Sequence, residues 1–299
     1  MNAPLAIFAK CRGLSHKAIS TSKRAMSSTN TSSKQLRRFA PLDTSLPNTH
    51  NAPKLKGVVF DMDGTLCLPQ NYMFKDMRAA LGIPKSVDIL EHLDSLSETP
   101  DDEGDTASSP RSRAQEAIKN IEREAMGRQQ PQPGLNELIT YLAKKDIHAA
   151  LCTRNFELPV KHLLEKFVSE EGRSHFHPLI TREAEGVRPK PSPEGIWACV
   201  QAWNRSIEDR GDIRAALSQF NKTTSAGDKM QSCVDVIMVG DSIDDIEAGA
   251  RAGAATVLLV NEENKHLLEE KQWPRKVDVS ISRLDELTEV LEKGFCARD

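Results

Sequence analysis

The chain has 299 residues, 38% of them hydrophobic, which is enough for one substantial core and a smaller accessory module. Residues 1–42 carry eight Lys/Arg and no acid, whereas the remaining 257 residues carry 32 basic and 43 acidic side chains. An acidic body of this kind argues against general nucleic-acid binding, which needs a clustered basic face. No stretch approaches the ~20 consecutive apolar residues of a membrane-spanning helix, so no membrane partner is expected.

The first 50 residues are expected to form a disordered basic leader. Up to about Phe39 they are rich in Ser, Thr, Lys and Arg and lack acids, which is typical of a mitochondrial transit segment. A plain basic tail is the alternative, and a start at Met26 would give a cytoplasmic product. The six cysteines include no Cys-x-x-Cys pair, so the sequence predicts neither a disulfide framework nor a zinc cluster, and a reducing compartment fits best.

The first predicted strand is the apolar run 57–60, which ends at the sequence Asp61-Met62-Asp63-Gly64. Apolar residues at helical spacing then predict a helical module over residues 71–130, with one of its helices at about 113–127. Five acids within residues 98–105 and the small residues after them predict a mobile loop over 98–110.

The main domain is expected to comprise residues 51–70 and 131–299. Apolar runs predict four further strands, at 147–152, 178–180, 234–239 and 255–260. Helices are expected between and after them, at 135–143, 160–167, from the Ser192-Pro193-Glu194 start onward, 243–252 and 284–291. Residues 204–232 are polar and irregular in pattern and are interpreted as a surface insertion. Strands alternating with helices predict a Rossmann-like parallel α/β sheet with helices on both faces.

Polar side chains gather at the predicted strand ends and in the loops beside them. Ligands of parallel α/β sheets bind beyond the carboxyl ends of the strands, so these side chains are expected to share one rim. They are Asp61, Asp63, Thr153, Arg154, Asn155, Lys190, Asp241, Ser242 and Asp245.

This set has the chemistry of phosphoryl transfer. The carboxylate of Asp61 can attack phosphorus and form an aspartyl-phosphate that water then hydrolyses. Asp63, two residues on, can protonate the leaving oxygen and later activate the water. Asp61, Asp241 and a substrate phosphate could not lie together without a cation, and an all-oxygen ligand set suits Mg²⁺.

The remaining side chains of the set are expected to bind phosphate or to support the site. Lys190 offers a point charge, and Thr153, Arg154 and Asn155 offer donors at a turn into a helix. Asp245 lies one helical turn after Asp241 and is expected, with Ser242, to orient Lys190 or a metal-bound water.

The sequence Asp61-Met62-Asp63-Gly64-Thr65-Leu66, followed by Thr153, Lys190 and Gly240-Asp241-Ser242 to Asp245, resembles the four motifs of the haloacid dehalogenase-like (HAD) hydrolase superfamily over about residues 56–290. The resemblance implies that Asp61 is the nucleophile, Asp63 the acid/base, and Thr153 and Lys190 phosphate binders. It also implies that Mg²⁺ is held by Asp61, Asp241 and the carbonyl of Asp63. The module at 71–130 is similar to the helical cap of the phosphoglycolate-phosphatase-like branch. Dehalogenases of the superfamily lack the second aspartate, so Asp63 favours phosphate chemistry.

The sequence therefore predicts a Mg²⁺-dependent phosphatase acting on a small phosphorylated metabolite. A phosphomutase that uses the same aspartyl-phosphate and a non-catalytic protein that binds a phosphometabolite are the alternatives. Substrate identity and oligomeric state stay open, because specificity depends on cap side chains whose contacts a sequence does not reveal.

Overall fold

The computed structural model describes residues 38–49, 51–99, 108–205, 213–268 and 277–295. The described residues all belong to one compact unit, and residues 1–34 lie outside them. The predicted transit segment therefore lies almost wholly outside the described residues, as does most of the predicted loop at 98–110. Within the described part of the chain, no helix combines the length and the hydropathy needed to cross a membrane.

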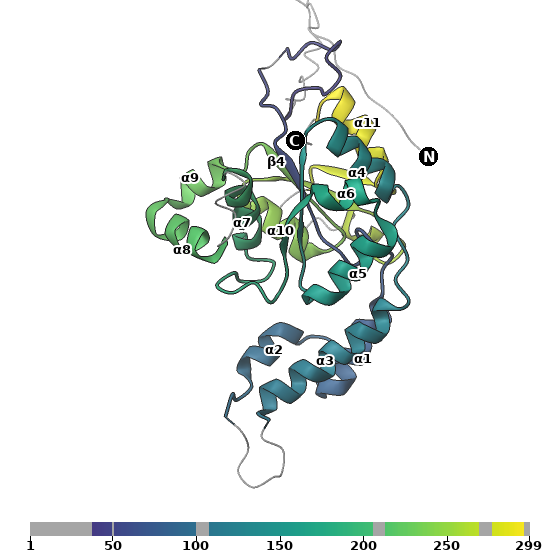
Figure 1. Cartoon of the computed structure of the whole chain (residues 1–299), viewed down its shortest axis with the longest axis vertical. Coiled ribbons are helices and arrows are strands. Elements are labelled where there is room, and N and C mark those ends of the chain that lie inside the picture. The colour runs from purple at the N-terminus through teal and green to yellow at the C-terminus, as the bar shows by residue number, and fades with distance from the viewer. Residues whose placement is uncertain (1–37, 50, 100–107, 206–212, 269–276, 296–299) are drawn as a thin grey trace, which may run out of the picture. The chain divides into compact units, whose positions relative to one another are not determined.

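A six-stranded sheet forms the centre of the fold (Figure 1). Its strands are β1 (Gly57–Phe60), β2 (His148–Cys152), β3 (Phe176–Ile180), β4 (Val236–Gly240), β5 (Ala255–Leu259) and β6 (Val279–Ile281). They run in the order β3-β2-β1-β4-β5-β6, and every pairing is parallel. The predicted parallel α/β sheet is confirmed, and the order places β1 beside both β2 and β4.

Helices cover both faces of the sheet, because successive side chains of each strand point to opposite sides. In β1, Val58 and Phe60 belong to one core cluster and Val59 to another. The first cluster includes side chains of α4 (Leu135–Lys144), α5 (Glu157–Phe167) and α11 (Glu286–Lys293), and the second those of α7 (Glu194–Trp203) and α10 (Ile243–Ala252).

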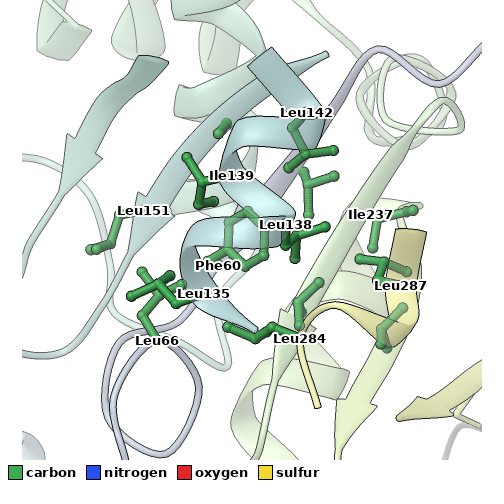
Figure 2. Packing of buried hydrophobic residues seen from close by; sticks show 14 of the residues in the cluster. Phe60, Leu66, Leu135, Leu138, Ile139, Leu142, Leu151, Ile237, Leu284 and Leu287 are labelled. Atoms are coloured by element: carbon green, nitrogen blue, oxygen red, sulfur yellow. The ribbon is translucent and has the colours of Figure 1, made fainter. Parts of the chain in front are cut away.

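The helix α4 shows how this packing arises from sequence. Its apolar residues Leu135, Leu138, Ile139 and Leu142 recur at helical spacing and are all buried. Figure 2 shows them turned toward Phe60 of the sheet. Each such side chain contributes roughly 1.5–3 kcal/mol of hydrophobic stabilisation when removed from water.

Between β1 and α4 the chain forms three helices, α1 (Asn71–Leu81), α2 (Ile89–Ser95) and α3 (Pro110–Met126), which Figure 1 shows gathered together. They bury a small cluster of their own, comprising Met73, Met77, Ile89, Leu93, Ile118 and Ala125. The start of α3 lies three residues earlier than predicted. Ser109 caps it by accepting a hydrogen bond from the N–H of Ser112, and Pro110 occupies the first turn.

The prediction for residues 204–232 was incomplete, because the segment contains α8 (Ile213–Thr223) and α9 (Ala226–Gln231). Phe220 packs, partly buried, against the cluster that includes α7. Two further elements, α6 (Glu170–His175) and β6, were also not predicted, and both are short.

Two expected boundaries also differ. The predicted disordered leader reached residue 50, yet Phe39 is buried and its ring packs edge-on against Phe295, with ring centres 5.2 Å apart. Residues 38–49 thus join the core through an apolar side chain. The helix α7 begins at Glu194, so Pro193 lies at its cap position and not in its first turn. Ser192 still accepts a hydrogen bond from the N–H of Glu194, at 3.4 Å.

Candidate active site

The sheet order brings the predicted residues to one cavity at the carboxyl ends of the strands. Asp61 directly follows β1, Thr153 follows β2 and Asp241 follows β4, and β1 lies between the other two. Lys190 comes from the loop between β3 and α7. All the residues predicted to form the site line this one cavity: Asp61, Asp63, Thr153, Arg154, Asn155, Lys190, Asp241, Ser242 and Asp245.

Lys190 lies at the centre of the charged groups. Its ammonium group forms ion pairs with Oδ1 of Asp61 and, at 2.6 Å, with Oδ1 of Asp245. All three side chains are buried. Burial alone would lower the pKa of Lys190, but the two carboxylates outweigh it and raise the pKa. Lys190 therefore remains positively charged beside Asp61.

Asp245 is held in place by the start of α10. Its Oδ2 accepts hydrogen bonds from the N–H of Asp241 and from both the N–H and the hydroxyl of Ser242. The hydroxyl of Ser242 in turn accepts from the N–H of Asp245, which completes a capping box. A Cβ at Gly240 would lie 2.2 Å from Cβ of Asp245, so only glycine allows this approach. Both oxygens of Asp245 are thus engaged, one by the cap and one by Lys190.

Asp63 has two donors at its carboxylate. Oδ2 accepts a hydrogen bond from Nδ2 of Asn155, and Oδ1 lies 3.6 Å from the thiol of Cys67. Burial raises the pKa of Asp63 to about 6. Asn155 was predicted to bind phosphate, but here its amide holds Asp63. Its N–H also donates to the hydroxyl of Thr153, at 3.2 Å.

Asp241 lies against the turn that follows β1. A Cβ at Gly64, whose φ is +81°, would lie 2.0 Å from Oδ2 of Asp241, so the turn needs glycine both for its conformation and for this contact. Asn264 donates to the carbonyl of Asp241 at 2.8 Å, and Asn261 to its Oδ2 at 3.4 Å. The two asparagines, which follow β5, were not predicted. Their position just after a strand is the sequence feature that could have identified them as residues of the site.

Arg154, which was predicted to bind phosphate, is engaged by two carboxylates in this structure. Its guanidinium donates to Asp88, at the start of α2, and to Asp244, in the first turn of α10. Asp88 also caps α2 through its other oxygen. These pairings raise the pKa of Arg154, although burial opposes the shift. Arg154 thus joins the helical segment 71–126 to the sheet domain.

A second arginine makes a similar connection and was also not predicted. Arg182, which follows β3, forms a two-pronged ion pair with Glu122 of α3, at 2.5 and 2.7 Å. Burial raises the pKa of Glu122 to about 7 despite this partner. Arg182 and Glu122 are 60 residues apart, and no local pattern in the sequence links them.

The donor set fits a hard divalent cation. Carboxylate oxygens of Asp61, Asp241 and Asp245 lie within 4.8 Å of one another. Because both oxygens of Asp245 are engaged, Asp61 and Asp241 are the two acids that could coordinate an ion, and oxygen ligands suit Mg²⁺.

Burial raises the pKa of Asp61 to about 7 even beside Lys190. Burial, followed by the charges of Asp245 and Asp61, raises that of Asp241 to about 8. Such shifts indicate a cluster that lacks enough positive charge.

The fold and the site define an α/β enzyme with a carboxylate and lysine centre at the carboxyl end of a parallel sheet. Residues 55–253 match the family model of haloacid dehalogenase-like hydrolases. An uncharacterized hydrolase of Saccharomyces cerevisiae is 36% identical over 250 residues, which covers 83% of this chain and 96% of the yeast protein. The chain therefore belongs to the haloacid dehalogenase-like hydrolases, as the motifs predicted.

Two further similarities agree with this assignment. A haloacid dehalogenase-like hydrolase domain-containing protein of Arabidopsis thaliana is 32% identical, over 71% of this chain and 73% of the plant protein. A solved structure from Lactobacillus plantarum, assigned as a phosphoglycolate phosphatase, has a TM-score of 0.50 and 16% identity and covers 79% of this chain and 99% of its own. At that identity the similarity concerns the fold alone.

Proposed function

We propose that this protein is a Mg²⁺-dependent phosphatase that hydrolyses a small-molecule phosphate monoester through an aspartyl-phosphate at Asp61. One observation carries the proposal. A buried carboxylate at the end of β1 is paired with Lys190, lies within 4.8 Å of a second acid and is followed two residues later by an acid in a different environment. Nucleophile, counter-charge and proton donor are thus present in one cavity.

Asp61 is suited to attack phosphorus because its carboxylate is fixed. The N–H of Asp61 donates to the carbonyl of Val239 in β4 at 3.0 Å, which ties its backbone to the sheet. Lys190 holds one carboxylate oxygen and keeps a positive charge where the phosphoryl oxygens would lie. Bound Mg²⁺, held by Asp61, Asp241 and the carbonyl of Asp63, would add the charge that lets an anionic nucleophile meet an anionic substrate.

Asp63 is suited to proton transfer because its pKa, about 6, is above that of an ordinary aspartate. A carboxyl group of this kind can donate a proton to the leaving alcohol and then accept one from the water that hydrolyses the aspartyl-phosphate. Thr153, buried at the end of β2, offers its hydroxyl to the phosphoryl group.

We also propose that residues 71–130 act as a cap over this site, with Arg154 and Arg182 joining it to the sheet domain. The mitochondrial location stays a proposal that rests on the composition of the leader. Fusing residues 1–50 to a fluorescent protein would test it, since a cytosolic signal would contradict it.

The test of the function is phosphate release from a panel of phosphate monoesters. We expect release in the presence of Mg²⁺, none with EDTA, and none from the Asp61→Asn variant. Transfer of the phosphoryl group to a bound sugar in preference to water would instead identify a phosphomutase. Binding of phosphate esters without turnover by the wild-type protein would identify a non-catalytic protein.

A further inference from the structure

The cavity is bounded by two walls, one from the sheet domain and one from the helical segment that follows β1. Its volume is about 580 Å³, within the range of ordinary small-molecule pockets. The core wall is formed by the polar side chains at the strand ends described above. The cap wall is formed by lining residues between 69 and 122. It contains five large apolar side chains, Phe74, Met77, Ile89, Leu90 and Ile118, beside the polar side chains of Gln70, Asn71, Arg78, Lys85, Asp88 and Glu122.

Two apolar side chains at this cavity remain exposed. Phe74 of α1 is 36% exposed, and Ile243, the first residue of α10, is 42% exposed. Both line the cavity, one from the cap wall and one from the sheet domain. A ligand that covered this apolar surface would remove it from water, which favours binding. The two side chains thus offer an apolar contact for the part of a substrate that is not phosphate.

Several polar side chains of the cavity are already engaged. Glu122 is paired with Arg182, and Arg154 with Asp88 and Asp244. On the cap wall, the amide nitrogen of Gln70 donates to the carbonyl of Ala125 and the hydroxyl of Tyr72. One terminal nitrogen of Arg78 donates to the carbonyl of Phe74, in the same helix, while its Nε has no hydrogen-bond partner among the described residues. A ligand with many hydroxyl groups would have to compete with these bonds, and any polar group left without a partner would weaken binding.

We infer that the substrate is a phosphate monoester whose alcohol part is a compact apolar body, such as an aromatic ring or a branched chain, and not a hydroxyl-rich sugar. Phe74 and Ile243 contact that body while the phosphoryl group lies at Asp61. The inference rests on the proposed phosphatase function, because it assigns the phosphate to the core wall.

The test compares phosphate esters that share a primary alkoxide leaving group, so that they differ only in the rest of the alcohol part. We expect kcat/KM for 2-phenylethyl phosphate to exceed that for glucose 6-phosphate at least about tenfold, which corresponds to ~1.4 kcal/mol. Phe74→Ala should lower kcat/KM for 2-phenylethyl phosphate far more than for ethyl phosphate and so remove most of this preference. Leu158→Ala is the matched control, because Leu158 is 45% exposed and is not among the cavity-lining residues. Equal or better turnover of glucose 6-phosphate, or an equal loss for all esters in Phe74→Ala, would overturn the inference.

Calorimetry with non-hydrolysable phosphonates separates this inference from the function on which it rests. We expect 2-phenylethylphosphonate to bind the Mg²⁺-loaded protein about tenfold more tightly than ethylphosphonate, and Phe74→Ala to abolish the difference. If no ester is hydrolysed but this binding difference is found, the proposed activity fails and the apolar subsite stands. If the esters are hydrolysed but the two phosphonates bind equally, the apolar subsite fails and the activity stands.

Discussion

The core wall and the cap wall of the cavity differ in how their polar groups are placed. On the core wall, Asp61 and Asp241 each come directly after a buried strand, so the sheet fixes their positions relative to each other. On the cap wall, Asp88 and Glu122 are carried by helices of a separate small cluster and meet core arginines across the cavity. The polar groups of the core wall are thus positioned by the sheet itself, whereas those of the cap wall are positioned by ion pairs between two packing units.

Asp61→Asn removes the proposed nucleophile from the core wall and should have the largest effect on activity. An amide cannot form the aspartyl-phosphate, so kcat should fall at least about a thousandfold, while the protein stays folded. Steady-state phosphate release measures it. Asp76→Asn, on the exposed face of α1, is the matched control and should leave kcat unchanged. Appreciable turnover by Asp61→Asn would mean that another group attacks phosphorus.

Arg182→Met removes the ion pair that connects the cap wall to the core wall. It leaves Glu122 buried without its partner, so the free energy of unfolding should fall by about 3 kcal/mol at pH 8. The loss should be smaller at pH 6, because Glu122, whose pKa is already about 7, can then take up a proton. Urea denaturation at the two pH values measures both effects.

Two variants control this experiment. The double variant Arg182→Met/Glu122→Gln should recover part of the stability, since no buried charge is left. Lys293→Met, which breaks an exposed ion pair with Glu289, should change stability by less than about 0.5 kcal/mol. If Arg182→Met lowers the free energy of unfolding no more than Lys293→Met does, the ion pair between Arg182 and Glu122 does not stabilise the protein.

The stability of the metal-free protein should depend on pH, because the core wall carries two acids with strongly raised pKa values. The pKa values of Asp61 and Asp241 are raised to about 7 and 8, against about 3.9 in an unfolded chain. The metal-free folded protein therefore holds protons that the unfolded chain has lost. Its free energy of unfolding should fall as the pH rises from about 4 to about 8.

Mg²⁺ should reverse this trend by taking the place of the protons. Stabilisation by saturating Mg²⁺ should reach roughly 2 kcal/mol at pH 8 and be much smaller at pH 5.5. Thermal unfolding with and without Mg²⁺ measures it, and Asp241→Asn should flatten the response. A Mg²⁺ effect that does not change with pH would contradict the raised pKa values.

Asn155→Ala is the smallest expected perturbation and concerns the orientation of Asp63 alone. Without its amide donor, Asp63 should protonate the leaving group less well, so alkyl phosphates should be hydrolysed about tenfold more slowly. Aryl phosphates with an acidic phenol need little protonation and should be affected much less. Asn136→Ala, at an exposed position, is the control. An equal loss for both classes of ester would point to phosphate binding by Asn155, as the sequence suggested.

The sequence predicted the core wall well because the positions of its residues follow from short segments of the chain. Asp61, Thr153 and Asp241 follow apolar runs whose ends share one rim of any parallel sheet. The shorter elements were missed because few residues define them. The strand β6 has three residues, and α8 and α9 lie in a mostly polar segment.

The cap wall could not be predicted in the same way, because its important contacts are tertiary. Arg154 stands beside Thr153 and was assigned to phosphate on that basis, but two carboxylates distant in sequence engage it. The pair of Arg182 and Glu122 likewise joins residues from different packing units. Whether an arginine meets substrate or a carboxylate depends on the docking of the helices, which periodicity does not encode.

Trapping of the phosphoenzyme tests the central claim most directly. The Mg²⁺-loaded enzyme would be mixed with a radiolabelled phosphate monoester, quenched in acid and mapped by peptide mass spectrometry. We predict one hydroxylamine-sensitive phosphoryl group per chain, on the peptide that contains Asp61, and none without Mg²⁺ or in Asp61→Asn. Phosphate release with no label on the protein, or label on a different residue, would contradict the account.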